Sequence, residues 1–164
     1  FLDLNYSSIA FYKNLSNIIA IILLPFFGKL IGKIDPRKFG VYTFLALLLH
    51  LLFMLLTEYF PVNFHFFKFQ LNIMLILSYV FNGVFTATMA LLWGIGSSYF
   101  CKNEDAGSYQ SVHLTMVGFR GLFAPILGIF FFELIGFTGT FAIGIISLTV
   151  AIYLMYWSIK KYIL

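Results

Sequence analysis

The stretch PFFGKLIGKIDPRKFG, Pro25–Gly40, decides how the rest of the chain is organised. It is interrupted by glycine and carries four basic side chains, Lys29, Lys33, Arg37 and Lys38, between two long apolar runs. This pattern predicts a tight loop held at one face of a membrane. Because Lys and Arg concentrate in cytoplasmic loops, it also predicts that this loop lies inside the cell.

The composition excludes several classes of protein. Of the 164 residues, 62% are hydrophobic, 22 are Phe and only 10% are charged, which is too apolar for a soluble core inside a polar surface. The net charge of +4 comes from residues at the ends of apolar runs, so we expect no binding to nucleic acid. The single cysteine, Cys101, excludes a disulfide within the chain and a multi-cysteine metal cage.

Five segments are long and apolar enough to cross a lipid bilayer, which takes about 20 residues at a rise of about 1.5 Å each. They are residues 8–31, 39–60, 71–99, 108–136 and 141–158. The sequence therefore predicts an all-α, polytopic membrane protein whose residues 1–164 form one bundle of five transmembrane helices. The aromatic-rich link Tyr59–Phe69 and the stretch GFTGT, residues 136–140, are expected to be turns between spans.

The basic residues predict the topology. Five crossings place the two ends of the chain on opposite sides of the bilayer. Lys68 alone then falls in an outer loop, and the basic residues on the cytoplasmic side are Lys29, Lys33, Arg37, Lys38, Lys102, Lys160 and Lys161. We therefore expect the N-terminus outside and the C-terminus in the cytoplasm.

Polar residues within the first and third spans are candidates for a solute pathway. Asn17 either lies at an interfacial helix end, with Lys13 extending toward the water, or faces an aqueous path. Ser78, Asn82 and Thr86 recur every four positions, which predicts that they share one helical face.

The fourth span carries the most chemistry. Gln110, His113 and Arg120 are spaced by three and seven residues and are expected on one face. An arginine near the centre of a spanning helix costs about 2.5 to 3.5 kcal/mol, so Arg120 either contacts a solute or gate, or extends to the interface or a fixed ion pair. Glu133 lies on roughly the opposite face. A lone histidine in the second span, His50, is expected to bond to a neighbouring helix.

We expect no enzymatic activity. The sequence contains no His, Asp and Glu set for a metal, no Ser or Cys nucleophile with a nearby base, and no paired carboxylates at a usable spacing. Accordingly, neither a metal nor another cofactor is expected.

The basic stretch resembles the cytoplasmic loop motif of the major facilitator superfamily. In that family a Gly-x-Leu-x-Asp-Arg type motif joins the second and third helices of each six-helix half. The corresponding run here is Gly28, Lys29, Leu30, Ile31, Gly32 and Lys33, followed by Pro36, Arg37 and Lys38 as the basic tail. Gly32 stands in place of the usual acidic residue and Lys33 in place of arginine. The acidic residue helps to lock the cytoplasmic gate in that family, and Asp35 is the candidate to replace it.

The stretch Ala106–Gly128 also resembles the fifth or eleventh helix of bacterial members of the superfamily. The resemblance implies helices two to six or eight to twelve, and the ending soon after Lys160, without a long central loop, favours the second choice. It thus implies a fragment of a transporter's C-terminal half, forming a major-facilitator-like half bundle in a bacterial inner membrane. The first, third and fourth spans would line the path, and the second and fifth would stand outside it.

Two hypotheses remain open at this point. The first is a secondary active transporter of a small solute, or its C-terminal fragment, which needs an N-terminal half on the same or a separate chain. Its pathway would be lined by Arg120, His113, Gln110, Asn82 and Thr86, with Arg120 attracting an anionic or polar group of the solute. The second is a truncated remnant without transport activity, or a small membrane subunit. The sequence identifies neither the solute nor a coupling ion.

Overall fold

The computed structural model describes residues 4–60, 62–66, 69–99 and 105–161. Its elements are α1 (Tyr6–Ile31), α2 (Pro36–Tyr59), β1 (Asn63–Phe66), β2 (Phe69–Asn72), α3 (Ile73–Tyr99) and α4 (Ala106–Lys161). The helices dominate, so the prediction of an all-α fold is confirmed, with a small antiparallel hairpin of β1 and β2 added to it. Each of the four helices is long and apolar enough to cross a membrane.

The loop in the basic stretch is shorter than predicted, because the second helix begins three residues before the expected residue 39. Helix α1 continues to Ile31 and α2 begins at Pro36, so that only residues 32–35 connect them. The N-termini of both helices are capped. Asn5 Oδ1 accepts a hydrogen bond from the backbone N–H of Ser8 at the start of α1, and Asp35 caps α2. The cap and the fixed φ of Pro36 explain why α2 starts so early.

The link before α3 is a hairpin rather than a plain turn. Asn63 pairs with Asn72 in the antiparallel register, so the expected third span begins at Ile73 instead of residue 71. Asn72 is the last residue of the hairpin and also caps α3, because its Oδ1 accepts a hydrogen bond from the backbone N–H of Leu75 at 3.1 Å. Its own backbone N–H donates to the Tyr12 hydroxyl at 2.8 Å, which ties the hairpin to α1.

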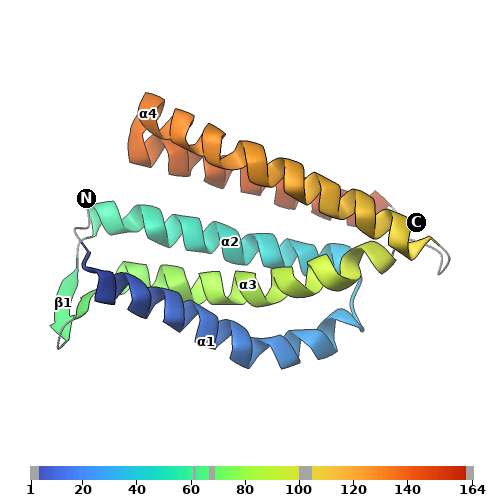
Figure 1. The fold of residues 1–164 in the computed structure, drawn as a ribbon, viewed down its shortest axis with the longest axis horizontal. Coiled ribbons are helices and arrows are strands. Elements are labelled where there is room, and N and C mark those ends of the chain that lie inside the picture. Colours follow the sequence, from blue (N-terminus) through green and yellow to red (C-terminus); the bar gives the residue numbers. More distant parts are fainter. Residues whose placement is uncertain (1–3, 61, 67–68, 100–104, 162–164) are drawn as a thin grey trace.

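Helix α3 lies between α1 and α2, and α2 in turn packs against α4 (Figure 1). Glycine permits the closest approaches. A Cβ added at Gly83 of α3 would lie 2.8 Å from the backbone oxygen of Ser16 in α1, and one added at Gly40 of α2 would lie 2.8 Å from Met155 Cε in α4. Small residues at helix crossings are typical of bundles that pack inside a bilayer.

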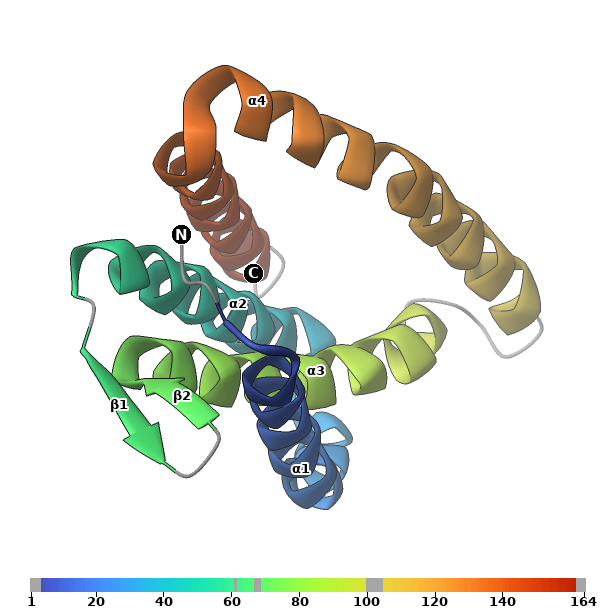
Figure 2. The ribbon, with the colours of Figure 1, turned by 60° about the vertical axis from the view of Figure 1, so that its left-hand side comes forward.

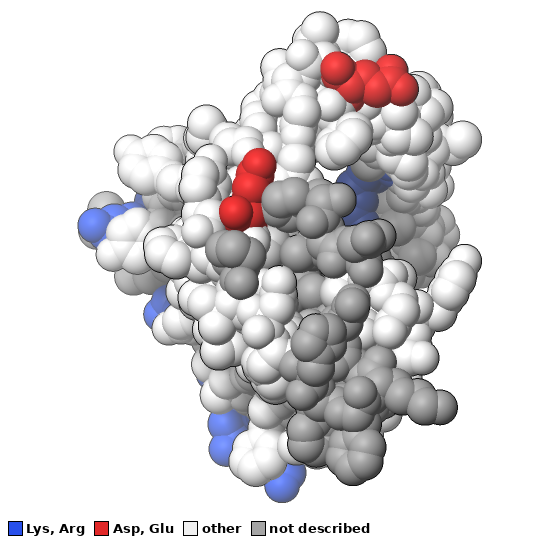
Figure 3. Space-filling model, turned by 90° about the vertical axis from the view of Figure 1, so that its left-hand side faces the viewer, with Lys and Arg blue, Asp and Glu red and all other residues white. Residues whose placement is uncertain are grey.

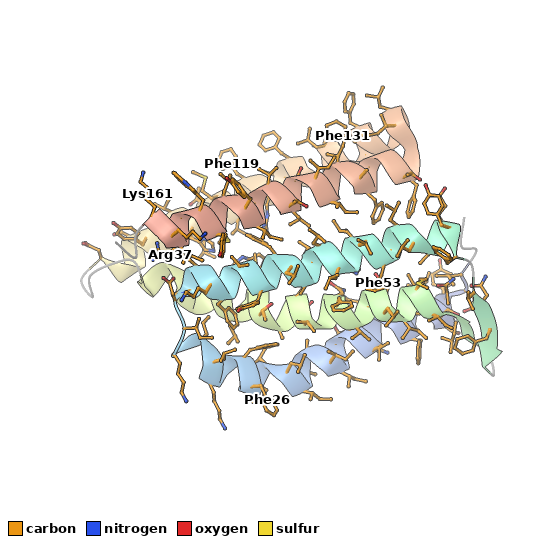
Figure 4. All side chains as sticks on the ribbon, turned by 180° about the vertical axis from the view of Figure 1, so that it is seen from behind. Phe26, Arg37, Phe53, Phe119, Phe131 and Lys161 are labelled. Carbon is orange, nitrogen blue, oxygen red and sulfur yellow. The ribbon has the colours of Figure 1, made fainter. Side chains whose placement is uncertain are left out.

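The distribution of side chains is reversed relative to a soluble protein. Helix interfaces bury small polar residues, among them Ser8, Ser16, Thr43, Ser78 and Thr88. Large apolar side chains point outward: Ile21 is 71% exposed, Leu122 is 68% exposed, and Phe26, which projects away from the bundle in Figure 4, is 73% exposed. Such a surface is stable only in an apolar medium, which indicates a membrane-embedded protein.

His50 joins α2 to α3, which confirms its predicted bond to a neighbouring helix. Its Nδ1 lies 2.7 Å from Ser78 Oγ and 3.0 Å from the Ser78 carbonyl oxygen, and Ser78 Oγ donates to the His50 carbonyl at 3.0 Å. Ser78 is therefore buried, whereas Thr86 is exposed. The predicted stripe is therefore unevenly exposed, because four-residue steps drift around a helix that repeats every 3.6 residues. Ser78 lies in the interface, whereas Asn82 and Thr86 lie beside it on the more exposed side.

Helix α4 covers the residues of both the fourth and the fifth expected spans. Its geometry breaks at Gly136, where φ is 71° and ψ is −172°, and the chain reverses direction there (Figures 1 and 2). A positive φ is readily adopted only by glycine, so this residue permits the reversal. We call residues 106–135 the first limb and residues 137–161 the second limb. The predicted turn over residues 136–140 is thus confined to Gly136.

Candidate functional site

The first limb of α4 is the least covered helical segment of the described chain. Figure 2 shows it standing apart from α1 and α2 along most of its length. No described residue from Gly107 to Ile135 is buried, and the half-buried positions are Gln110, His113, Val117, Gly128 and Phe131. Their spacing places them on one face, which is the face turned toward the rest of the molecule. Arg120 lies at the edge of this face.

Trp93, near the end of α3, brings two of the predicted site residues together. The guanidinium carbon of Arg120 lies 5.4 Å from the centroid of the Trp93 ring, and Gln110 Nε2 donates to the Trp93 carbonyl at 3.3 Å. A cation over an indole ring contributes about 0.5 to 2 kcal/mol, with the larger value away from water. Trp93 therefore positions Arg120, and our sequence analysis did not identify it.

Arg120 keeps its charge available. In the part of the chain that the structure describes, no carboxylate forms an ion pair with it, so the fixed partner considered above is not found there. Its contact is instead with the face of an aromatic ring, which stabilises a cation without neutralising it. Figure 3, viewed along the long axis from the hairpin end, shows a mostly uncharged face with few acidic side chains.

His113 lies one turn beyond Gln110 on the same face. Its Nε2 is buried and has no hydrogen-bond partner among the described residues. A buried polar atom without a partner costs about 1 to 3 kcal/mol, so this nitrogen is suited to meet a group supplied from outside the chain.

The face of α3 that leads to Trp93 carries Asn82 and Thr86. Asn82 is half-buried and Thr86 is exposed, and Trp93 follows Thr86 by seven residues, which places it on the same side of the helix. The Thr86 hydroxyl donates to the Asn82 carbonyl at 2.8 Å, so only its acceptor lone pairs remain for a ligand.

Asn17 stands apart from this group. It is exposed on α1, and no hydrogen bond joins it to Trp93, Gln110 or Arg120 within the described ranges. The structure thus brings together Arg120, Gln110 and Trp93, with His113, Asn82 and Thr86 on the adjoining faces.

The loop motif forms a second charged group at the opposite end of α2 from the hairpin. Arg37 Nη2 lies 2.8 Å from Asp35 Oδ2, and Arg37 Nη1 donates to the Ser158 carbonyl in the second limb at 3.5 Å. Lys29 and Lys33 are exposed. Gly28 and Gly32 have no atom within 4 Å of an added Cβ, so neither is required for space within this chain.

Other expectations lie outside the described residues. These are the positions of Lys68, Cys101 and Lys102.

Comparisons of the chain with protein-family models, with curated proteins and with solved structures find no match. The class of protein is therefore defined by the fold itself: an all-α chain with four helices of membrane-spanning length and an apolar outer surface. On this scaffold the site offers an unpaired guanidinium, an indole ring and amide side chains. Such a set can form hydrogen bonds and charge contacts with an anionic or polar group.

Proposed function

We propose that this chain is part of the C-terminal half, helices eight to twelve, of a secondary active transporter of the major facilitator type that moves a small solute. The single observation that carries the proposal is Arg120, a cation near the middle of an apolar limb, held over Trp93 without a carboxylate partner in the described chain. Ionisable residues at such positions usually serve a substrate or ion path.

The geometry of α4 supports five crossings. Residues 106–135 and 137–161 each exceed the roughly 20 residues that a crossing requires, and they run in opposite directions about Gly136. The start of α1 and the end of α4 lie at opposite ends of the molecule, as an odd number of crossings requires (Figure 1).

The packing is consistent with a half bundle of this type. Helix α2 and the second limb pack together through Gly40 and Met155, and both would stand outside the path. Helices α1 and α3 and the first limb would line it, with Asn82, Thr86 and Arg120 on the lining. An opposing N-terminal half, on the same or a separate chain, would complete the site, because alternating access requires two bundles that rock about it.

Arg120 would attract the negative or polar end of the solute, and Trp93 would keep the guanidinium oriented toward it. Gln110 and His113 would supply hydrogen bonds from the same limb. On the cytoplasmic side, the pair of Asp35 and Arg37 would act as part of the gate, since Arg37 already links the loop to the second limb at Ser158.

A labelling experiment tests this path without knowledge of the solute. In a Cys101→Ser background, single cysteines replace Arg120 or Thr86, and membranes are treated with a charged maleimide. We expect both sites to react at least about tenfold faster than the matched control Leu122→Cys, because only a water-exposed thiol ionises readily. Leu122 lies two residues beyond Arg120, on the other side of the limb, and is 68% exposed.

Equal labelling at all three positions would count against a water-filled path on this face. Once a solute is known, Arg120→Ala should abolish uptake by the transporter assembled with its N-terminal half. Unchanged uptake would remove Arg120 from the site. A chain that neither transports nor depends on such a half would instead be a remnant or a small membrane subunit.

A further inference from the structure

One end of the molecule collects most of the described basic side chains. They are Lys29, Lys33, Arg37, Lys38, Lys160 and Lys161, and Figure 4 shows Arg37 and Lys161 together at this end. Two described carboxylates lie near the same end, Asp35 and Asp105, and Asp35 is already paired with Arg37. This end therefore presents an excess of positive charge.

A groove of 430 Å³ opens between α2 and the second limb beside these charges. It is lined by Lys38, Val41, Tyr42, Tyr156 and Ile159. Its two walls are held at a set distance by the close contact of Gly40 with Met155 and by the hydrogen bond from Arg37 to the Ser158 carbonyl. The groove is thus part of the fold rather than a gap between loose side chains.

A second hollow of 380 Å³ adjoins the first. It lies among α1, α2 and α3, and its apolar lining includes Phe27, Leu30, Ile34, Phe39 and Val84. Tyr42 lines both hollows and is 61% exposed. Its ring therefore forms a ridge with an apolar furrow on either side.

Two cations lie beside the first groove. Lys38 lines the groove one helical turn before Tyr42, on the same face of α2. Lys160 Nζ lies 5.0 Å from the centroid of Tyr156, which lines the opposite wall. Neither lysine is paired with a carboxylate among the described residues, and no carboxylate lines the groove.

We propose that this groove binds an anionic phospholipid, whose phosphate lies between Lys38 and Lys160 and whose two acyl chains follow the furrows on either side of Tyr42. Basic side chains above an apolar groove at the cytoplasmic interface are typical of sites for acidic headgroups. A zwitterionic lipid would find no carboxylate for its ammonium, and a free anion would leave the furrows unfilled. Such a site requires only that the helices lie in a membrane, and it does not depend on transport.

Native mass spectrometry of the full chain in detergent tests the proposal, with dioleoyl phosphatidylglycerol and dioleoyl phosphatidylcholine as probes. We expect the apparent Kd of the first phosphatidylglycerol to rise about fivefold in Lys38→Gln, with phosphatidylcholine binding unchanged. The matched control is Lys161→Gln, which removes the same charge at the same end and is expected to change this Kd less than twofold. Lys161 lies over Trp157, which does not line the groove.

A second variant tests the furrow without changing charge. Val41→Trp fills the groove and should weaken phosphatidylglycerol binding by at least the same factor. Lys38→Gln should keep its fold, because a cation in the first turn of a helix opposes the helix dipole and its removal costs nothing there.

Three results would overturn the proposal. The first is an equal loss in Lys38→Gln and Lys161→Gln, which would mean a diffuse basic surface. The second is equal affinity of the wild-type chain for both lipids. The third is a result that assigns the site to a free anion. Either full binding of the lipid in Val41→Trp or displacement of the lipid by glycerol phosphate at the lipid's own concentration would be such a result.

Discussion

At the scale of single residues, Asp35 has two roles at the start of α2. Its Oδ1 accepts from the Arg37 backbone N–H at 2.8 Å, which caps the helix, and both carboxylate oxygens accept from the Arg37 guanidinium. The hydrogen bond from Arg37 holds the pKa of the Asp35 carboxyl below its ordinary value of 3.8. A folded-state pKa below the unfolded one means that this pair stabilises the fold above about pH 4 and is lost as the pH falls further.

We therefore predict that Asp35→Asn lowers the free energy of unfolding by about 0.5 to 1 kcal/mol at pH 7, because asparagine still caps the helix but cannot pair with Arg37. The difference from the wild type should become smaller as the pH is lowered from 7 to 3, because the pair is lost as the carboxylate is protonated. Thermal unfolding in detergent, followed by circular dichroism at both pH values, measures it. A difference that stayed constant across this range would mean that the ion pair does not contribute.

At the scale of elements, the glycines divide into those that pack and those that do not. Gly83 lies where α3 meets α1, with the Ser16 carbonyl and Ile19 Cβ each 2.8 Å from an added Cβ. Gly118 and Gly121 in the first limb have nothing within 4 Å. The same residue type therefore permits close packing in one helix and leaves an open surface in another.

We predict that Gly83→Ala destabilises the chain by about 1 to 3 kcal/mol, because backbone atoms of α1 must move to admit the methyl group. Gly118→Ala is the matched control and should raise stability by up to about 1 kcal/mol through helix propensity alone. Titration with sodium dodecyl sulfate, monitored by helical circular dichroism, compares the two variants. Equal effects would mean that α1 and α3 are not in close contact at Gly83.

At the scale of the whole molecule, the break at Gly136 bears on how many times the chain crosses the membrane. If the two limbs cross separately, the chain crosses five times and its ends lie on opposite sides. If α4 crossed once, the ends would lie on the same side. The basic residues at the end of α4 favour the first arrangement, because Lys160 and Lys161 would then join Arg37 and Lys38 at the cytoplasmic face.

We predict that a green fluorescent protein fused after Leu164 fluoresces in bacterial cells, since this protein matures in the cytoplasm and not in the periplasm. A cysteine at Val62, beside the hairpin, should react with an impermeant maleimide added to intact cells. A dark fusion together with a reactive Val62→Cys would point to four crossings, with α4 acting as a single span.

Several features of the site were predictable from local pattern, and others were not. The mid-span position of Arg120 and its spacing from Gln110 follow from counting residues along a helix. Trp93 does not, because its role depends on where the end of α3 meets the first limb. One signal was present: Trp93 follows Thr86 by seven residues, on the face already assigned to the pathway.

The sequence by itself determined that the chain forms long apolar helices with charge at their ends, since helix length and hydropathy are local properties that the bilayer thickness converts into spans. Only the tertiary structure decided which polar residues are used within the bundle and which remain available. His50 and Ser78 satisfy each other between two helices, whereas the contact of Arg120 within the described ranges is with an aromatic ring. The reason is physical: hydrogen bonds and close contacts depend on which residues of separate helices meet, and no periodicity along one helix contains that information.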